Sequence, residues 1–452
     1  MNISFKALGG GNEIGANCYL LTLGNTNLVL DCGLHPRKKG AEMFPDLDLI
    51  KDMDINDLII THAHTDHISS LPYFLKFFPH INIHCTAATL SAMEVMLVNT
   101  SHLLKKEYEE SFDKDLIENY SEEVLNMIPM IVKRYDYNEK IILSEDLSFK
   151  FLNAGHIIGS ASVLIEAGNK KLFYTGDINL RDQSLIPMAV LPRHKVDILI
   201  TESTNCGVDD YPDYETETER LAKFINDIIN ANGSVLIPAF AMGKSQEMLT
   251  RISSLIENNK IPRVPIYYSF MSGKVDQVYD RYNYTVDRIE KGFKLGKIEV
   301  IPLERSDTKR GDFYNEPSIL ILTSGMIMER TASYKIAKRF LPLDNFGIAV
   351  CGYCDPETPG FQIRSAKKND IIFLNSLEDG ILVKCKIGNF RFSAHARKKE
   401  IMEMIDKLDP ETVIIVHGDE PAVSNLGNYI LNKNKNTRVI SPEKGKSYEL
   451  IP

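Results

Sequence analysis

The sequence predicts a layered α/β protein, and two observations support this fold class. Short apolar runs, which are typical of buried strands, alternate along the chain with segments of helical periodicity. Several of these runs also lead directly to a histidine or an acidic residue. In layered sheets, ligand-binding side chains gather at the ends of strands. We therefore expect a rigid sheet framework that carries a polar site.

The first predicted strands lie within the N-terminal thirty residues. Apolar runs at 2–8, 17–21 and 27–30 are separated by glycine-rich or polar turns. The segment 86–130 is predicted to be helical, because its apolar residues repeat at the helical period and form one face.

Five further strand-like runs are each followed by a polar residue capable of catalysis. They occupy 58–60, 172–174, 198–200, 390–392 and 413–416, and the residues that follow them are His62, Asp177, Glu202, His395 and His417. We predict that these five residues, although distant in sequence, assemble into one site.

The composition is that of an ordinary soluble globular protein. At about 150 residues per domain, 452 residues indicate two to four domains. Hydrophobic residues make up 44% and charged residues 25%, which excludes disordered and collagen-like classes for the chain as a whole. The formal charge of −9 excludes a globally basic nucleic-acid coat protein, although a local basic groove is compatible with it.

The seven cysteines are odd in number and irregular in spacing, which argues against a disulfide framework and favours a reducing cytoplasm. Cys351 and Cys354 form a single CxxC pair. Because no second pair accompanies it, we interpret it as two buried residues rather than half a zinc site or a redox pair. The N-terminus lacks the apolar core of a signal peptide, and no apolar run has the length of a membrane helix. We therefore expect a cytoplasmic protein without membrane contact.

The strongest motif is a run of six residues that contains His62, His64, Asp66 and His67. From the composition, a chance match is expected about once in a thousand such chains. The first two histidines can face one ion from an extended segment, and the last two residues can face a second ion. Imidazole and carboxylate ligands suit Zn²⁺, with Mn²⁺ and Fe²⁺ as alternatives. A polar surface loop is the competing interpretation, and the rarity of histidine in this chain disfavours it.

Further motifs accompany the run 62–67 along the chain. They are the early Asp31, Gly155-His156-Ile157-Ile158-Gly159-Ser160, Tyr174-Thr175-Gly176-Asp177, Thr201–Thr204, 238–247, 324–326, Phe392–Ala396 and Val416–Gly418. With the run 62–67, the motifs at 31, 155–160 and 174–177 resemble the metal motifs of the metallo-β-lactamase-fold hydrolases. Those at 201–204, 392–396 and 416–418 resemble motifs A, B and C of the β-CASP branch of this fold, and 238–247 and 324–326 resemble two more of its stretches. The resemblance runs in order across nearly the whole chain. β-CASP proteins are nucleic-acid nucleases, including the pre-mRNA 3′-end cleavage nuclease and bacterial RNase J.

This resemblance implies an αββα metallo-β-lactamase sandwich with an inserted α/β β-CASP domain. The sandwich would be built from residues 1–207 and a C-terminal return at 385–452. The β-CASP domain would occupy 208–384, with the active site in the cleft between the two domains. An insertion of this kind accounts for the long separation of His395 and His417 from His62.

The resemblance also implies two zinc ions and assigns the residues that would coordinate each of them. His62, His64 and His156 would hold one ion, Asp66, His67 and His417 the other, and Asp177 would bridge both. The pair would provide a hydroxide that attacks phosphorus. Asp66 is expected to be a catalytic residue as well as a metal ligand. Asp31 would orient a ligand histidine, a role compatible with capping the turn before Gly33.

His395 is the expected general acid, because an imidazole can protonate a departing ribose oxygen near neutral pH. Glu202 would hydrogen-bond to it and raise its pKa. In the family, the position of His417 is generally histidine in members that act on RNA and apolar in DNA-repair members. The resemblance therefore favours RNA.

Three residues are expected to contact the substrate: Lys244, Gly325 and Arg330. The family usually has a glycine-rich turn soon after Gly325-Met326, whereas this chain has Ile327-Met328-Glu329-Arg330. Arg330 could contact a phosphate, and Glu329 could repel one. The simpler alternative is a surface ion pair between these two neighbours.

The resulting prediction is a zinc-dependent ribonuclease that hydrolyses RNA phosphodiester bonds in RNA processing. A DNA nuclease of the same fold and a non-nuclease metallo-hydrolase are the alternatives. The expected partner is RNA, with a homodimer left open.

Overall fold

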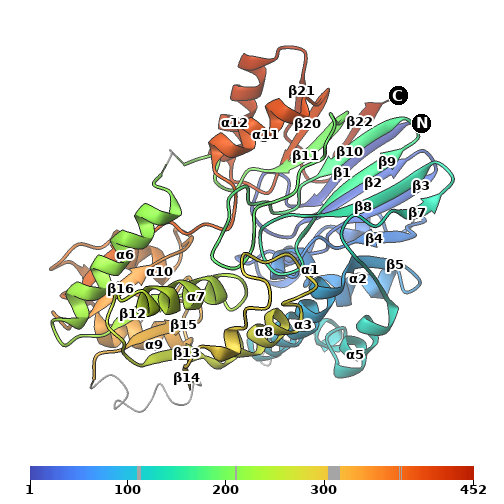
Figure 1. The fold of residues 1–452 in the computed structure, drawn as a ribbon. Coiled ribbons are helices and arrows are strands. Elements are labelled where there is room, and N and C mark those ends of the chain that lie inside the picture. Colours follow the sequence, from blue (N-terminus) through green and yellow to red (C-terminus); the bar gives the residue numbers. More distant parts are fainter. Residues whose placement is uncertain (109–113, 209–210, 304–315, 376, 378, 452) are drawn as a thin grey trace. The chain divides into compact units, whose positions relative to one another are not determined.

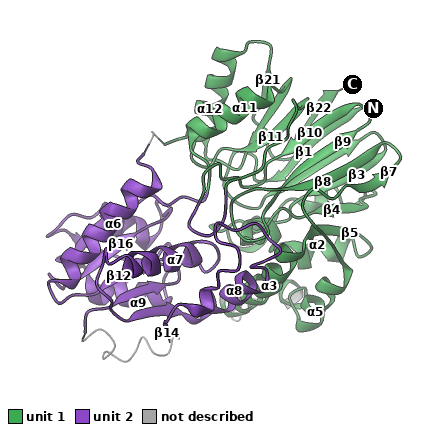
Figure 2. Cartoon of the chain, in the orientation of Figure 1, with its two compact units in different colours: residues 1–182, 188–210, 395–452 green, residues 183–187, 211–394 purple. Residues whose placement is uncertain are grey.

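The computed structural model describes residues 1–108, 114–208, 211–303, 316–375, 377 and 379–451, and it divides into two compact units (Figure 2). Unit 1 comprises residues 1–182, 188–210 and 395–452. Unit 2 comprises residues 183–187 and 211–394. Unit 2 is thus inserted into unit 1. The insert predicted from the sequence, 208–384, differs from it mainly at the C-terminal end, where unit 2 continues to residue 394.

Unit 1 contains two seven-stranded sheets that pack face to face (Figure 1). The first sheet has the order β22-β1-β2-β3-β4-β5-β6. Its strands are β1 (Ile3–Gly9), β2 (Cys18–Leu23), β3 (Thr26–Leu30), β4 (Asp57–Ile59), β5 (Asn82–Thr86), β6 (Val132–Tyr135) and β22 (Ser447–Ile451). The second sheet has the order β21-β20-β11-β10-β9-β8-β7. Its strands are β7 (Ile141–Ser144), β8 (Leu147–Asn153), β9 (Ala161–Ala167), β10 (Lys170–Tyr174), β11 (Ile198–Glu202), β20 (Thr412–Val416) and β21 (Arg438–Ile440).

The core of unit 1 lies between these sheets. Phe5 and Tyr19 of the first sheet meet Phe149, Phe151 and Tyr174 of the second in one cluster of buried side chains. Alternate residues of each strand point inward, as the two-residue period of a strand requires. Each such buried side chain contributes on the order of 2 kcal/mol by removal of its apolar surface from water. The two sheets are therefore held as one rigid support for the loops at their ends.

Helices cover the outer faces and complete an αββα sandwich (Figure 1). On the second sheet, Ile401, Met404 and Leu408 share one face of a helix and pack with Leu199 and Ile415. The helices over this sheet are α11 (Lys398–Leu408) and α12 (Glu420–Lys433). Those on the side of the first sheet are α1 (Thr65–Ile68), α2 (Leu71–Phe77), α3 (Ala87–Tyr108), α4 (Lys114–Glu118) and α5 (Glu122–Ile131), with the short 3₁₀ helices η1 (Gly40–Met43) and η2 (Leu47–Leu49).

Unit 2 is built on a six-stranded parallel sheet with the order β14-β13-β15-β12-β16-β19. The strands are β12 (Val235–Pro238), β13 (Ile266–Ser269), β14 (Ile301–Leu303), β15 (Ile319–Leu322), β16 (Gly347–Val350) and β19 (Lys386–Asn389). The helices are α6 (Tyr214–Ile229), α7 (Lys244–Glu257), α8 (Phe270–Arg281), η3 (Leu295–Lys297), α9 (Ala332–Phe340) and α10 (Pro359–Ser365), and β17 (Ile371–Ile372) pairs with β18 (Ile381–Leu382).

Most of the elements predicted from the sequence are confirmed, and one strand is not. The strands predicted at 2–8, 17–21 and 27–30 are β1, β2 and β3, and the helical segment 86–130 contains α3, α4 and α5. The prediction of a strand at 390–392 was wrong, because β19 ends at Asn389 and the next residues are irregular. Phe390 and Phe392 are buried, and Arg391 between them is exposed. This alternation is the sequence pattern of a half-buried strand. The backbone N–H of Arg391 is bonded instead to the Glu217 carboxylate, at 2.9 Å.

Two further sequence expectations concern the cysteines and membranes. All seven cysteines are free and buried, including Cys351 and Cys354. Within the described part of the chain, none of the helices combines the length and apolarity that crossing a bilayer requires.

Candidate metal centre

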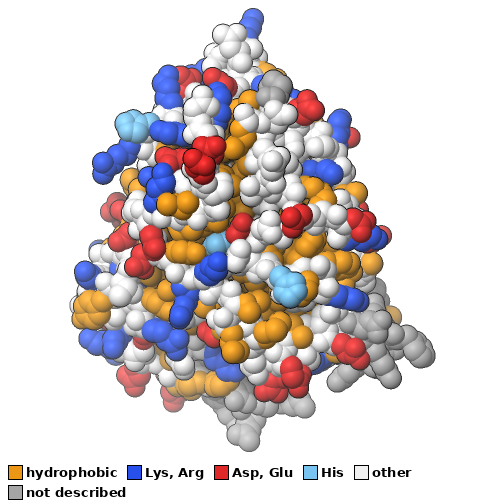
Figure 3. Space-filling model, turned by 90° about the vertical axis from the view of Figure 1, so that its right-hand side faces the viewer, with side chains coloured by type: hydrophobic (Ala, Val, Ile, Leu, Met, Phe, Trp, Pro, Cys, Tyr) orange, Lys and Arg blue, Asp and Glu red, His pale blue; other side chains and the backbone are white. Residues whose placement is uncertain are grey.

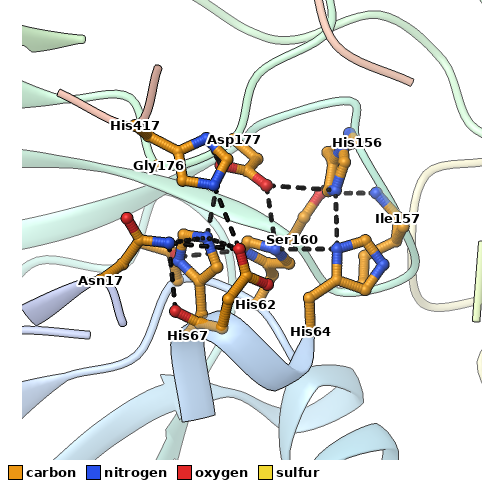
Figure 4. Close-up of polar contacts among 12 residues, drawn as sticks. Asn17, His62, His64, His67, His156, Ile157, Ser160, Gly176, Asp177 and His417 are labelled. Carbon is orange, nitrogen blue, oxygen red and sulfur yellow. Dashed lines mark hydrogen bonds and ion pairs between the residues drawn. The ribbon is translucent and has the colours of Figure 1, made fainter. Parts of the chain in front are cut away.

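Three imidazoles and one carboxylate of unit 1 converge at the ends of β4, β8 and β10 (Figure 4). His64 Nδ1 lies 3.2 Å from His62 Nε2 and 3.1 Å from His156 Nε2. Asp177 Oδ2 lies 3.4 Å from His62 Nε2 and 3.5 Å from His156 Nε2. Ligand atoms around a tetrahedral zinc ion are about 3.3 Å apart, because each is about 2.0–2.1 Å from the ion. These four side chains therefore have the spacing of a metal site.

A second group of ligand-type side chains adjoins the first. It consists of Asp66 and His67 on α1 and His417 after β20. Asp66 Oδ2 lies 3.1 Å from His417 Nε2 and 3.8 Å from His67 Nε2. In Figure 4, His67 and His417 lie on one side of Asp177, and His64 and His156 on the other.

Asp177 connects the two groups. While its Oδ2 faces His62 and His156, its Oδ1 lies 3.4 Å from His67 Nε2 and 3.5 Å from His417 Nδ1. Asp177 Oδ1 is buried, and none of the described residues donates a hydrogen bond to it. A buried carboxylate oxygen without a partner is costly, and coordination of a cation removes that cost. The residues present therefore fit a divalent metal centre.

Asp31 orients one histidine of the second group. It follows β3, is fully buried, and its Oδ2 accepts hydrogen bonds from His67 Nδ1 at 2.8 Å and from the Tyr174 hydroxyl at 2.7 Å. Its Oδ1 accepts from the backbone N–H of Thr61 at 2.8 Å. In the neutral imidazole this carboxylate holds the proton of His67 on Nδ1, so that the lone pair of Nε2 faces the site.

The backbone around the site adopts conformations that few residues tolerate. Asp31 and His417, both at strand ends, have φ values of +57° and +49°. Such conformations cost roughly 1–3 kcal/mol each and cluster at functional sites. At Gly33, a Cβ atom would lie 1.6 Å from the carbonyl oxygen of Asp66, so only glycine lets the 31–34 loop pack on α1.

The histidines of the two groups have pKa values shifted in opposite directions. Burial lowers the pKa values of His62, His64 and His156, and that of His64 falls to about 3, so these rings are neutral as metal ligands must be. Burial also opposes protonation of His67 and His417, but the nearby carboxylates, Asp177 first among them, together outweigh it and raise both pKa values. Excess negative charge in the second group thus attracts protons, as it would attract a cation.

His395 and Glu202 lie beside the metal-binding groups. His395 Nδ1 is 3.0 Å from both carboxylate oxygens of Glu202, and the ring centroids of His395 and His156 are 4.7 Å apart. Burial would lower the pKa of His395, but Glu202 and Asp177 raise it to about 9. Glu202 itself is held by the backbone N–H of Ile178, which donates to Oε1 at 2.8 Å. The arrangement holds a proton on His395 next to the metal ligands.

The segment before His395 belongs to unit 2 and is anchored there. The Lys244 ammonium donates to the carbonyl oxygen of Phe392, and the Tyr214 hydroxyl donates to that of Ser393. The Arg251 guanidinium lies over the Phe392 ring, 4.6 Å from its centroid. Lys244 is buried in this arrangement. Its predicted contact with RNA stays a prediction.

The other two predicted substrate contacts lie on one loop of unit 2. Gly325 is buried, and a Cβ atom there would lie 3.0 Å from the backbone nitrogen of Phe240. Glu329 and Arg330 are both exposed. Among the described residues, neither of them forms an ion pair. The structure therefore does not support the alternative in which Glu329 and Arg330 simply pair with each other on the surface.

Three polar residues at the centre, Thr61, Thr204 and Asn17, are not singled out from the sequence. Thr204 Oγ1 lies 2.9 Å from His417 Nδ1, and Asn17 Nδ2 lies 2.9 Å from His67 Nε2. Thr204 belongs to a motif that the sequence did indicate. The sequence indicates Asn17 only as the start of a strand. The one available signal of a further role is its place as a polar residue between a glycine-rich turn and an apolar strand.

Three family models match the chain. Residues 11–195 match the metallo-beta-lactamase superfamily, residues 245–363 the Beta-Casp domain, and residues 380–442 a Zn-dependent metallo-hydrolase RNA specificity domain. The last two matches fall within unit 2 and across its junction with the C-terminal part of unit 1.

The chain is similar to several curated proteins. It is 30% identical to an RNase J-like protein of Methanocaldococcus jannaschii, with 92% of this chain and 93% of that protein covered. It is 29% identical to an Integrator complex subunit 11 homolog of Dictyostelium discoideum, covering 96% of this chain but only 59% of that protein. It is 28% identical to cleavage and polyadenylation specificity factor subunit 3-II of Arabidopsis thaliana, covering 94% and 68%. Among solved structures, a protein of unknown function from Enterococcus faecalis shares the fold, with a TM-score of 0.59, 15% identity, and coverage of 99% and 100%.

Proposed function

Because the chain belongs to the β-CASP branch of the metallo-β-lactamase superfamily, we propose that it is a zinc-dependent ribonuclease that hydrolyses RNA phosphodiester bonds. The observation that carries this proposal is the position of Asp177. Its two oxygens face two different groups of ligand atoms, and the buried Oδ1 accepts no hydrogen bond from the described residues. This is the arrangement expected of a carboxylate shared by two cations.

The donor set favours zinc. His62, His64 and His156 would hold one ion, and Asp66, His67 and His417 the other. Neutral imidazoles with a minority of carboxylates suit Zn²⁺ better than Mg²⁺ or Ca²⁺, which prefer oxygen ligands. When bound, two such ions would supply a hydroxide at neutral pH and stabilise the negative charge that develops on a phosphate.

His395 is proposed as the general acid. Cleavage of a phosphodiester leaves a ribose oxygen that needs a proton, and His395 holds one at Nε2 while Nδ1 faces the Glu202 carboxylate. Glu202 would keep the ring oriented and stabilise its protonated form. In the metal-free protein the pKa of about 9 means that this proton is present at neutral pH.

Two features of the C-terminal segment favour RNA over DNA as the substrate. The match at 380–442 is to a domain described by its RNA specificity, and the chain's motif C residue is His417. The relatives named for polyadenylation, for the Integrator complex and as RNase J-like agree with this choice. The free cysteines favour a reducing compartment, and we propose the cytoplasm.

RNA binding would depend on local charge. On the face drawn in Figure 3, lysine and arginine side chains are interspersed with aspartate and glutamate, and the formal charge of the chain is −9. A polyanion would therefore be attracted by particular residues, such as Arg330, and not by the protein as a whole.

The test is cleavage of matched RNA and DNA oligonucleotides of one sequence by zinc-loaded protein, with sequencing of the product ends. The proposal expects zinc-dependent cleavage of RNA and little of DNA. Equal or preferred cleavage of DNA would establish a DNA nuclease. Hydrolysis of neither polymer by protein that holds its metal would refute the nuclease assignment.

A further inference from the structure

Asn17 is built into the second group of metal-binding residues. It is fully buried immediately before β2. Its backbone N–H donates to the carbonyl oxygen of Asp66 at 3.0 Å, and its carbonyl oxygen accepts from the N–H of Gly33 at 3.0 Å. The main chain of Asn17 is therefore fixed between α1 and the 31–34 loop.

The side-chain amide nitrogen of Asn17 points at two ligand atoms. Nδ2 lies 2.9 Å from His67 Nε2, 3.3 Å from Asp66 Oδ2 and 3.1 Å from the carbonyl oxygen of Asp66. Figure 4 shows the side chain of Asn17 directed at His67. The carbonyl oxygen of Asp66 is an acceptor only, so the nitrogen of the amide, and not its oxygen, must face it. The amide oxygen is 2.8 Å from the Tyr19 hydroxyl.

The hydrogen atoms of this amide have defined targets. One is directed at the backbone carbonyl of Asp66. The other is shared between the Asp66 carboxylate and His67 Nε2, whose lone pair faces the amide when the imidazole is neutral, because Asp31 then holds the remaining proton on Nδ1. A cation bound at His67 would take that lone pair. The second hydrogen would then go to Asp66 Oδ2 and hold that carboxylate with one oxygen toward His67 and His417.

We infer that Asn17 is a positioning residue that sets the affinity of the second metal site without affecting the first. Groups that orient metal ligands typically change affinity by 10- to 100-fold when removed. This inference rests on the proposed function only in requiring two ions. It does not depend on which substrate is cleaved.

The experiment is a titration of metal-free protein with Zn²⁺ against a chromophoric chelator, combined with elemental analysis at limiting zinc. For Asn17→Ala we expect the first zinc to bind as in the unaltered protein and the second about 10- to 100-fold more weakly. The matched control is Tyr19→Phe, which removes the hydroxyl at the other end of the same amide and keeps the amide nitrogen. Its effect on the second zinc should be clearly smaller.

Each outcome decides the inference. Unchanged or tighter binding of the second zinc in Asn17→Ala would overturn it while leaving the proposed function intact. Equal weakening of both ions would also overturn it. If the unaltered protein binds fewer than two ions, the dinuclear centre itself fails, and the inference fails with it. Circular dichroism of the metal-free variants checks folding. If Asn17→Ala does not fold, Asn17→Leu, which keeps the approximate shape of the side chain but removes the amide donor without adding charge, should weaken the second ion.

Discussion

His395 Nδ1 lies 3.0 Å from each of the two carboxylate oxygens of Glu202. This contact fixes which nitrogen of His395 faces the metal ligands, because the other nitrogen is occupied by the carboxylate. It also joins two residues that are 193 positions apart in the chain. The contact is the basis of the first prediction.

His395→Ala should reduce RNA cleavage by about 10²–10⁴-fold, which is the usual contribution of a general acid, while bound metal is retained. The loss should be much smaller on a nitrophenyl phosphodiester, because nitrophenolate leaves without a proton. Cleavage rates on both substrates, with metal content measured on the same samples, check this. An equal loss on both would mean that His395 positions substrate and does not supply the proton.

Asp177→Ala and His417→Ala should differ in their effects on metal content. Asp177 faces both groups of ligand atoms, so its loss should weaken both ions. His417 contacts Asp66 in the second group, so its loss should weaken mainly one ion. Elemental analysis of proteins purified without chelator gives the two stoichiometries. The bridging assignment is wrong if the two variants lose the same amount of metal.

Glu329 and Arg330 should act in opposite directions on RNA binding. Both side chains are exposed, and we predict that Arg330 contacts backbone phosphate. Arg330→Ala should then weaken binding and lower the salt dependence by about one released counterion. Glu329→Gly should tighten non-specific binding, since a carboxylate near a polyanion is repelled. Binding of one RNA across a salt series measures both effects, and unchanged affinity and slope in both variants would contradict them.

Asp276 should make unit 2 less stable as the pH rises. Burial raises the pKa of this carboxyl group from 3.8 to about 7, against the hydrogen bonds that Gln246 and Tyr268 donate to it. Because the folded state holds the proton more tightly than the unfolded state, the free energy of unfolding should fall between about pH 4 and pH 7, by at most about 1.4 kcal/mol per pH unit. Asp276→Asn keeps the acceptor oxygen and removes the titration.

Urea unfolding followed by circular dichroism at pH 5 to pH 8 tests this, since the chain has no tryptophan for fluorescence. The variant should gain stability relative to the unaltered protein as the pH increases. A constant difference across this range would show that Asp276 does not titrate there.

The sequence predicted the elements whose signals are local. Apolar periodicity predicted β1 to β3 and the helical segment with α3 to α5, and the rare run of histidines at 62–67 predicted a metal site by its composition alone. The resemblance to a family then connected this run with His395 and His417. The order of the family's motifs along the chain assigns these distant residues to one site, which their spacing in the sequence does not.

The tertiary structure decided what depends on contacts between distant segments. Asn17 reaches His67 across 50 positions, and no feature of a short strand start predicts such a contact. The alternation of Phe390, Arg391 and Phe392 predicted a strand, but a strand needs backbone hydrogen bonds to an adjacent strand. The backbone N–H of Arg391 donates instead to the side chain of Glu217. The sequence by itself determined which residue types are available for the chemistry. Only folding determined which atoms face one another, because packing of the two sheets brings the strand ends together.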